Sequence, residues 1–376
     1  MARHPGELRW ETRLLTVVTA TMVVFGIANA YGALSLQTPG GAAAFALRQM
    51  VGALVGLLAL SVVASVDYHV WRRAAWPLLI ATILLLLIPV LPGLGRWSPS
   101  LNGARRWVKF GGFQFQPSEL ARLAIIIWCA MLAAKKGAQV REFKKGVMPF
   151  LVGIGAVSLL IFLEPNLSMA TLVALLGMVV LFAAGAKIGH FILLGFGGLF
   201  LVYEKIQSAQ YRMARLTTFL NPGDGTDAAG MQIHQSLVGI GSGRFFGVGF
   251  GEGQQKLFLP YAYSDFLFST IGEEWGFLGV VLVVVLFGIF LWLGFRIARS
   301  APDPFGQFLA VGITAMVGIT AVMHMAVSLA LMPTTGLTLP FMSYGRSSLV
   351  ISLVATGILV NIGRMRGRPS KEPAAS

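Results

Sequence analysis

Residues 277–295 read FLGVVLVVVLFGIFLWLGF, a run without a single charged side chain. A helix needs about 20 apolar residues to cross the hydrocarbon core of a bilayer. This run therefore predicts a membrane-spanning helix, which we place at residues 266–295. Further apolar stretches predict the same structure at residues 14–34, 46–66, 75–93, 118–134, 147–163, 167–185, 188–205, 306–331 and 345–363. The sequence thus predicts an all-α integral membrane protein with ten transmembrane helices.

The composition of the 376 residues excludes most soluble folds. Hydrophobic residues make up 56% of the chain and charged residues only 12%, whereas an average globular domain carries about 25% charged residues. The formal net charge is +14. The basic residues interrupt apolar runs instead of gathering on one polar domain, so we expect no nucleic-acid partner. The single cysteine, Cys129, rules out an intrachain disulfide and a thiolate metal cluster.

The orientation follows from the basic residues, which mark the cytoplasmic side of a membrane protein. They are more numerous in the connections on the side of the N-terminus. We therefore predict a cytoplasmic segment at 1–13, a membrane domain at 14–363 and a basic cytoplasmic tail at 364–376. Residues 28–30 imitate a signal-peptide cleavage site. The apolar run continues past them, so we expect this segment to be retained.

Two predicted outer connections are too long to be simple turns, at 94–117 and 206–264. The second is the large outer loop between the seventh and eighth predicted helices. The outer side carries more basic residues than the charge rule favours, among them Lys109, Arg212, Arg215, Arg244, Lys256 and Arg346. Two interpretations are open. These side chains reach lipid headgroups, or they neutralise a bound diphosphate.

Glycines crowd residues 239–253. The segment superficially resembles a phosphate-binding loop, but GSGRFF at 241–246 lacks the last glycine of a nucleotide fingerprint and follows no predicted strand. We therefore expect a flexible re-entrant stretch that bends near the membrane.

Acids at span edges or inside spans are costly and indicate function or pairing. Glu119 stands three residues before Arg122, so on a helix the two share one face. Two interpretations are open: a structural ion pair that fixes helix packing, or a functional pair. Glu273 and Glu274 lie deeper in a span and cannot face lipid. We predict an interior polar network for them, more structural than catalytic, with candidate partners Arg48, Arg122 and His324.

Asp265 stands at the start of the eighth predicted span, on the outer side. A carboxylate at a helix start is commonly a cap. The helix N-terminus also keeps such a group ionised, which would let it take a proton from a hydroxyl group. Position alone leaves both roles open.

Residues 332–345, MPTTGLTLPFMSYG, closely resemble the signature of the SEDS family, the integral-membrane peptidoglycan glycosyltransferases. The segments that carry further resemblance, in the same order as in the family, are 103–108, 116–122, 211–221, 232–249 and 256–276. The resemblance covers essentially the whole chain. TLPF at 338–341 and APDPFG at 301–306 are more like the division proteins of the family, FtsW, than the elongation proteins, RodA.

The resemblance implies roles for individual residues. The family's essential aspartate falls on Asp265, within YSDF at 263–266, and its paired acid and base fall on Glu119 and Arg122. Gln232 and Ser343 lie inside matching segments and join the predicted substrate-binding residues. The chain departs from the family at Asn166, where an Asp is common, at Arg346, where GRSS replaces Gly-Gly-Ser-Ser, and at 30–33 in the first helix.

The implied reaction is the polymerisation of lipid II into glycan strands at the outer face of a bacterial cytoplasmic membrane, at the division septum. Asp265 would act as general base on the acceptor hydroxyl, with inversion at the donor carbon and release of undecaprenyl diphosphate. Lys109, Arg212, Arg215 and Lys256, with Arg244 and Arg346, would neutralise the diphosphate, and a divalent cation, Mg²⁺ or Mn²⁺, is a candidate to share that task. No metal ligand is predicted.

Partners implied by the family are a class B penicillin-binding protein and other membrane proteins of the division machinery. Two rival functions fit the same features. A flippase would move lipid II across the membrane without making bonds, and a scaffold would only recruit a transpeptidase.

Overall fold

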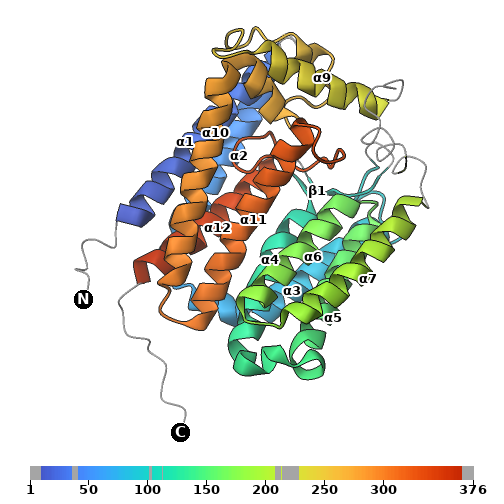
Figure 1. The fold of residues 1–376 in the computed structure, drawn as a ribbon, viewed down its shortest axis with the longest axis vertical. Helices are drawn as coiled ribbons and strands as arrows, with labels where there is room; N and C mark the ends of the chain where they lie inside the picture. The colour runs from blue at the N-terminus through green and yellow to red at the C-terminus, as the bar shows by residue number, and fades with distance from the viewer. Residues whose placement is uncertain are drawn as a thin grey trace.

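The computed structural model describes residues 10–35, 41–100, 104–111, 113–207, 213 and 228–365 (Figure 1). It has a helix at each of the membrane segments that the sequence predicts. These helices are α1 (Trp10–Ser35), α2 (Ala42–Val63), α3 (His69–Val90), α4 (Pro117–Lys136), α5 (Met148–Leu163), α6 (Leu167–Ala183), α7 (Ile188–Gln207), α10 (Leu267–Arg299), α11 (Pro304–Ser328) and α12 (Arg346–Met365). Within the described residues, eight helices are long and apolar enough to cross a membrane. The apolar helix α6 and the apolar part of α7 are shorter.

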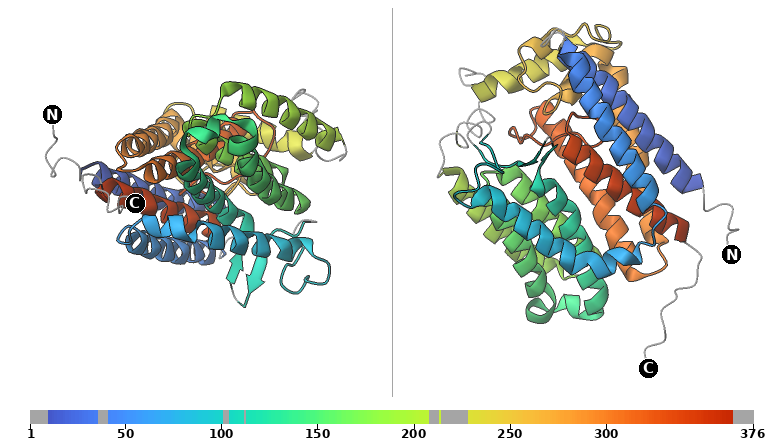
Figure 2. Two further views of the ribbon diagram at one scale, coloured as in Figure 1. Left: turned by 90° about the horizontal axis from the view of Figure 1, so that it is seen from below. Right: turned by 180° about the vertical axis from the view of Figure 1, so that it is seen from behind.

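The helices form two groups (Figures 1 and 2). One contains α1, α2, α10, α11 and α12, and the other contains α3 to α7. The groups meet where α11 packs against α4 and α6. A Cβ added to Gly312 of α11 would overlap the side chain of Ile126 on α4. Small residues at such crossings let two membrane helices approach closely, and α4 is consequently buried over most of its length.

The helix α9 (Ala228–Ser242) and a β hairpin lie at one end of the bundle, which we call the α9 end (Figure 1). Two strands, β1 (Val108–Phe110) and β2 (Phe113–Phe115), form an antiparallel hairpin. This hairpin departs from the purely helical prediction. Short helical turns complete the chain, at η2 (Gly137–Arg141), η3 (Phe143–Val147) and η5 (Gln255–Leu257).

The opposite end of the bundle holds both the start of α1 and the end of α12. A Cβ added to Gly363 would lie 2.6 Å from Cγ2 of Thr12. The start of α1 and the end of α12 therefore lie on the same side of the bundle.

Helix α10 is broken at Gly276, whose backbone has φ 61° and ψ −155°. The break frees backbone groups, and the glycine-rich segment binds them. The amide of Val248 donates to the carbonyl of Glu273 over 3.0 Å, and the amide of Phe277 donates to the carbonyl of Arg244 over 2.9 Å. A bilayer tolerates an interrupted helix only where such groups are satisfied by protein.

Glycine is required where this segment crosses α10. A Cβ on Gly243 would overlap the carbonyl oxygen of Gly272. The predicted bend is present, with positive φ at Gly247, Gly249 and Gly251. The segment is hydrogen-bonded to α10 rather than loose, so its glycines serve close packing more than flexibility.

Candidate functional site

A cavity of about 490 Å³ opens at the α9 end, between the first turns of α4 and α12, the β hairpin and the segments 261–265 and 335–338. Its charged lining residues are Arg106, Glu119, Arg122, Asp265 and Arg346. Four aromatic side chains also line it, Trp107, Tyr261, Tyr263 and Tyr344. The cavity thus combines acids, bases and rings, the side chains that bind sugars and phosphates. We call it the Asp265 cavity.

Asp265 lies half-buried in the cavity wall, just before α10. Its amide donates to the carbonyl of Tyr261 over 2.9 Å, and Ser264 Oγ donates to its Oδ1 over 3.0 Å. The N-cap position of α10 falls one residue later, on Phe266. Asp265 therefore belongs to a tight turn that faces the cavity, and the helix begins beyond it.

Tyr263 stands beside Asp265 in the same wall. Burial raises the pKa of Tyr263, and the charge of Asp265 acts in the same direction. Its hydroxyl therefore stays protonated at neutral pH and can donate a hydrogen bond to a bound group.

Ser343 is buried behind this wall and does not line the cavity. Its Oγ donates to the carbonyl of Ser264 over 2.7 Å and accepts from the amide of Leu339 over 2.9 Å. It ties the signature segment to the turn that carries Asp265. The predicted substrate contact of Ser343 is corrected here to a positioning role, because both its bonds are to backbone.

Glu119 and Arg122 form the ion pair predicted from their spacing, and both are buried at the cavity. Arg122 also donates to Ser348 Oγ on α12 over 3.3 Å. Its Nε has no hydrogen-bond partner within the described residues. The pair is therefore a structural link between α4 and α12 that leaves one buried donor unused.

Arg106 is a cavity residue that sequence reasoning did not select. Its Nε donates to the carbonyl of Glu164 over 3.2 Å, and its guanidinium also donates to the carbonyl of Pro165. Burial raises the pKa of Glu164 to about 8, and the charge of Arg106 opposes this shift. The signal was the arginine and tryptophan at 106–107, which lie within a segment that already resembled the family.

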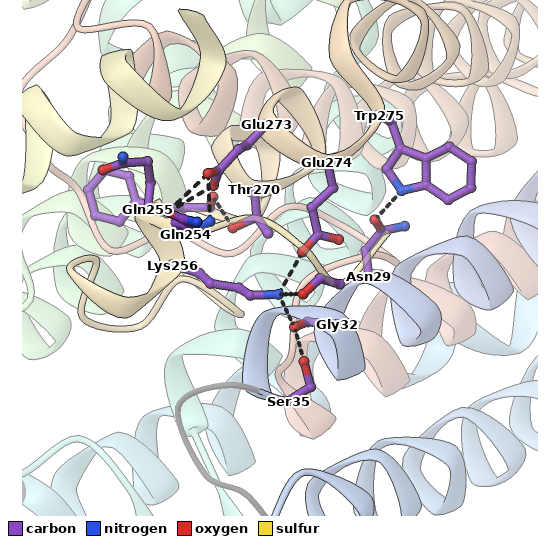
Figure 3. Close-up of polar contacts among 12 residues, drawn as sticks. Asn29, Gly32, Ser35, Gln254, Gln255, Lys256, Thr270, Glu273, Glu274 and Trp275 are labelled. Carbon is purple, nitrogen blue, oxygen red and sulfur yellow. Dashed lines mark hydrogen bonds and ion pairs between the residues drawn. The ribbon is translucent and has the colours of Figure 1, made fainter. Parts of the chain in front are cut away.

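Lys256 lies outside the cavity lining, in a buried network with α10 and α1 (Figure 3). Its Nζ is 2.8 Å from Oε1 of Glu274 and donates over 2.7 Å to the carbonyls of both Gly32 and Gly251. Neither charged side chain is exposed to solvent. The predicted diphosphate contact of Lys256 is corrected accordingly, because its ammonium is already bonded inside the protein.

Glu273 and Glu274 form the interior polar network that the sequence predicted, but with other partners. The Glu273 carboxylate accepts from the amides of Gln254, over 2.7 Å, and Gln255, over 3.1 Å (Figure 3). Glu274 pairs with Lys256. The candidate partners bind elsewhere: Arg48 lies over the ring of Phe45, Arg122 pairs with Glu119, and His324 Nδ1 bonds the carbonyl of Leu337.

The other predicted binding residues are not brought together by the described structure. Lys109 is exposed on β1, opposite Gln114, which does line the cavity. Arg244 is exposed and Gln232 is half-buried on α9, and neither lines the cavity. The two remaining arginines, Arg212 and Arg215, lie outside the described residues.

Comparison with known proteins agrees with the signature segment. The cell cycle protein family of FtsW, RodA and SpoVE matches residues 10–367. A protein of Trichlorobacter lovleyi, named a probable peptidoglycan glycosyltransferase FtsW, is 41% identical over 367 residues, or 96% of this chain and 95% of that protein. Stage V sporulation protein E of Bacillus subtilis is 38% identical over 355 residues, or 93% of this chain and 96% of that protein.

Solved structures show the same relationship. A chain in a structure of a peptidoglycan synthase complex has a TM-score of 0.78 and 29% sequence identity, over 94% of this chain and 98% of that chain. The similarity thus extends from the signature segment to the whole helical fold. On this evidence the chain belongs to the FtsW, RodA and SpoVE family of cell cycle proteins.

Proposed function

We propose that this protein is a peptidoglycan glycosyltransferase of cell division, which polymerises lipid II at the outer face of the bacterial cytoplasmic membrane. Its FtsW relatives are named as such enzymes, at 38–41% identity over most of their length. The observation that carries the proposal is the position of Asp265, in the wall of a cavity that also presents Arg106, Arg122 and Arg346.

The chemistry follows from these groups. Asp265 takes the proton of the acceptor sugar hydroxyl, and the resulting oxygen attacks the anomeric carbon of the donor. The bond from that carbon to the diphosphate breaks, and undecaprenyl diphosphate leaves with the electron pair. A single displacement inverts the anomeric centre. Positive side chains stabilise the charge that develops on the leaving group, while the cavity aromatics present flat faces to the sugar rings.

The membrane arrangement is part of the proposal. Ten helices cross the bilayer. They are the eight long apolar helices together with the shorter apolar helices α6 and α7. Both termini, at 1–13 and 364–376, lie in the cytoplasm, and the α9 end faces outward with the large loop 206–264. The polyprenyl tails of donor and product then lie in lipid beside the bundle, which explains why a sugar polymerase is embedded in a membrane.

The predicted binding residues divide by position. Arg346 lies in the cavity, and Lys109 lies on the strand beside it. Gln232 and Arg244 do not line the cavity, and Arg212 and Arg215 lie outside the described residues, so all four stay predictions for substrate binding.

A divalent cation, Mg²⁺ or Mn²⁺, stays a prediction from the sequence. Within the described residues no three His, Cys, Asp or Glu side chains come together as a metal site, and the carboxylate of Glu119 is already paired with Arg122. These described residues do not fit a cation held by the protein alone.

The proposed partners are a class B penicillin-binding protein and other membrane proteins of the division machinery at the septum. A related chain is part of a solved peptidoglycan synthase complex. Coupled polymerisation and crosslinking would account for such an assembly.

The test is polymerisation of labelled lipid II by the purified protein in detergent. We expect glycan polymer from the parent and loss of at least about a hundredfold in rate from Asp265→Asn, with unchanged folding. Glu142→Gln, which removes an exposed carboxylate from the turn between α4 and α5, is the matched control. Equal rates for parent and Asp265→Asn would refute the base assignment.

The same preparation separates the rival functions. Transport of labelled lipid II across sealed vesicles with no polymer formed would establish a flippase. Assembly with the transpeptidase and no polymer from any preparation would establish a scaffold.

A further inference from the structure

The first turn of α12 forms part of the cavity wall. Gly345, Arg346, Ser347 and Ser348 all line the cavity. Within the described residues, the amides of 346, 347 and 348 have no hydrogen-bond partner. Free amides and the helix dipole together make a helix N-terminus attractive to anions. The open start of α12 therefore presents partial positive charge to the cavity.

Two arginines add full charge at this position. Arg346 is half-exposed in the cavity and has no ion-pair partner within the described residues. Arg122 is only 1% exposed, also lines the cavity, and keeps an unpartnered Nε. A buried donor without an acceptor is costly, so this Nε points independently to a ligand that would accept from it.

The start of α4 holds the start of α12 in place. The amide of Gln116 donates to Ser347 Oγ and Arg122 donates to Ser348 Oγ, each over 3.3 Å. Thr338 Oγ1 donates to Ser348 Oγ over 3.1 Å. These bonds fix both serine side chains, which leaves the amides and the two guanidinium groups as the available donors.

We propose that the first turn of α12, with Arg346 and Arg122, is the subsite that binds the diphosphate of the lipid-linked donor. The inference rests on the proposed function for the identity of that donor. A diphosphate offers several oxygens to several donors at once, which suits a planar guanidinium beside free amides. Glu119 already balances Arg122, so of these two arginines Arg346 supplies the net positive charge of the subsite.

Gly52 of α2 makes room for this arginine. A Cβ at Gly52 would lie 3.1 Å from Cγ and 3.4 Å from Cβ of Arg346. The three atoms nearest to such a Cβ all belong to Arg346, so a larger side chain there would push against the arginine stem. The subsite therefore has a second residue through which it can be tested.

The test measures binding without turnover. The full-length protein in detergent is titrated with undecaprenyl diphosphate, inorganic pyrophosphate, phosphatidylglycerol and the free stem peptide. We expect Arg346→Ala to weaken both diphosphates about tenfold or more, and Arg346→Lys to weaken them less. Arg299→Ala, which removes an exposed arginine from the far end of α10, is the control and should bind as the parent does.

Three outcomes would overturn the inference. Parental affinity of Arg346→Ala for both diphosphates would show that the subsite lies elsewhere. An equal loss of phosphatidylglycerol binding would indicate a general headgroup site. A loss confined to the stem peptide would assign Arg346 to a carboxylate.

A double-mutant cycle gives a second measurement. Gly52→Val should weaken diphosphate binding in the parent but add little to Arg346→Ala, whereas Gly155→Val on the open face of α5 should change neither. Additive losses would contradict the subsite. If Arg346→Ala made polymer with the parental KM for lipid II, the subsite would be refuted and the proposed function would be retained. If the parent bound diphosphate but made no polymer, the proposed function would be refuted and the diphosphate subsite would be retained.

Discussion

Lys256 and Glu274 form an ion pair that is closed to solvent, with 2.8 Å between Nζ and Oε1. The lysine comes from the segment before α10 and the glutamate from α10 itself, and the same ammonium reaches the end of α1 through Gly32 (Figure 3). Taking two charges out of water is expensive unless each is fully bonded. The pair therefore holds three elements in one arrangement, the segment before α10, α10 itself and α1.

We expect Lys256→Met to destabilise the protein by about 3–5 kcal/mol, because it leaves the Glu274 carboxylate buried and uncompensated. Thermal unfolding in detergent measures this, with Lys144→Met on the exposed turn between α4 and α5 as control. The double variant Lys256→Met, Glu274→Leu should recover much of the loss. A variant with parental stability and only a raised KM for lipid II would restore the diphosphate role.

Gly243→Ala should destabilise the junction between the glycine-rich segment and α10, since its Cβ would overlap the carbonyl of Gly272. We expect a loss of about 1–3 kcal/mol or more. Gly241→Ala, two residues earlier at the end of α9, has open space around its Cβ and should be neutral or slightly stabilising. Comparable melting temperatures for the two variants would show that the junction tolerates a side chain.

Glu164 should make the stability of the protein fall as pH rises. Its pKa in the folded protein is about 8, above the ordinary 4.5, so the folded state holds a proton that the unfolded chain releases over this interval. Stability is therefore lost from about pH 4.5 to about pH 8 and then levels off.

Glu164→Gln should flatten this dependence and raise the melting temperature at pH 8.5 by about 2–4 °C relative to the parent. Melting curves at pH 5 and 8.5 provide the measurement, and Glu252→Gln at an exposed position is the control. Parallel pH profiles for parent and Glu164→Gln would mean that the acid is ionised in the folded state.

Ser343→Ala should lower kcat about ten- to a hundredfold while KM for lipid II stays near the parental value. The change removes the bond that holds the turn carrying Asp265, and small displacements of a catalytic group are costly. Ser300→Ala serves as control in the same polymerisation assay. It removes the hydrogen bond from Ser300 Oγ to the carbonyl of Arg296 at the other end of α10. A raised KM with unchanged kcat would instead favour direct substrate contact.

The helix positions were largely predictable because hydrophobic length is a local property of the chain. Boundaries shifted where charge interrupted an apolar run. The prediction for the third helix began at 75, after Arg72 and Arg73, whereas α3 begins at His69. Long basic side chains extend toward the interface and need not end a helix. The β hairpin was missed because its strands, three residues each, are too short to give a periodic signal.

The site was only partly predictable. Glu119 and Arg122 were paired correctly because three residues along a helix determine a shared face. Asp265 was singled out by its position and by the family motif, and it lies in the cavity. Lys256 and Ser343 were given substrate contacts because charge and motif reveal nothing about burial. Arg106 went unselected, since its contact with the α5–α6 turn joins residues far apart in sequence.

The sequence by itself determined that the chain is a helical membrane protein and singled out the acid at the start of one span, because apolar length and a local motif are carried by neighbouring residues. Only the tertiary structure decided which charges meet. It buried Lys256 against Glu274 and brought Arg346 to the same cavity as Asp265. Those outcomes depend on how distant helices pack, and the cost of an unpaired charge in a low-dielectric interior is what selects among the possible pairings.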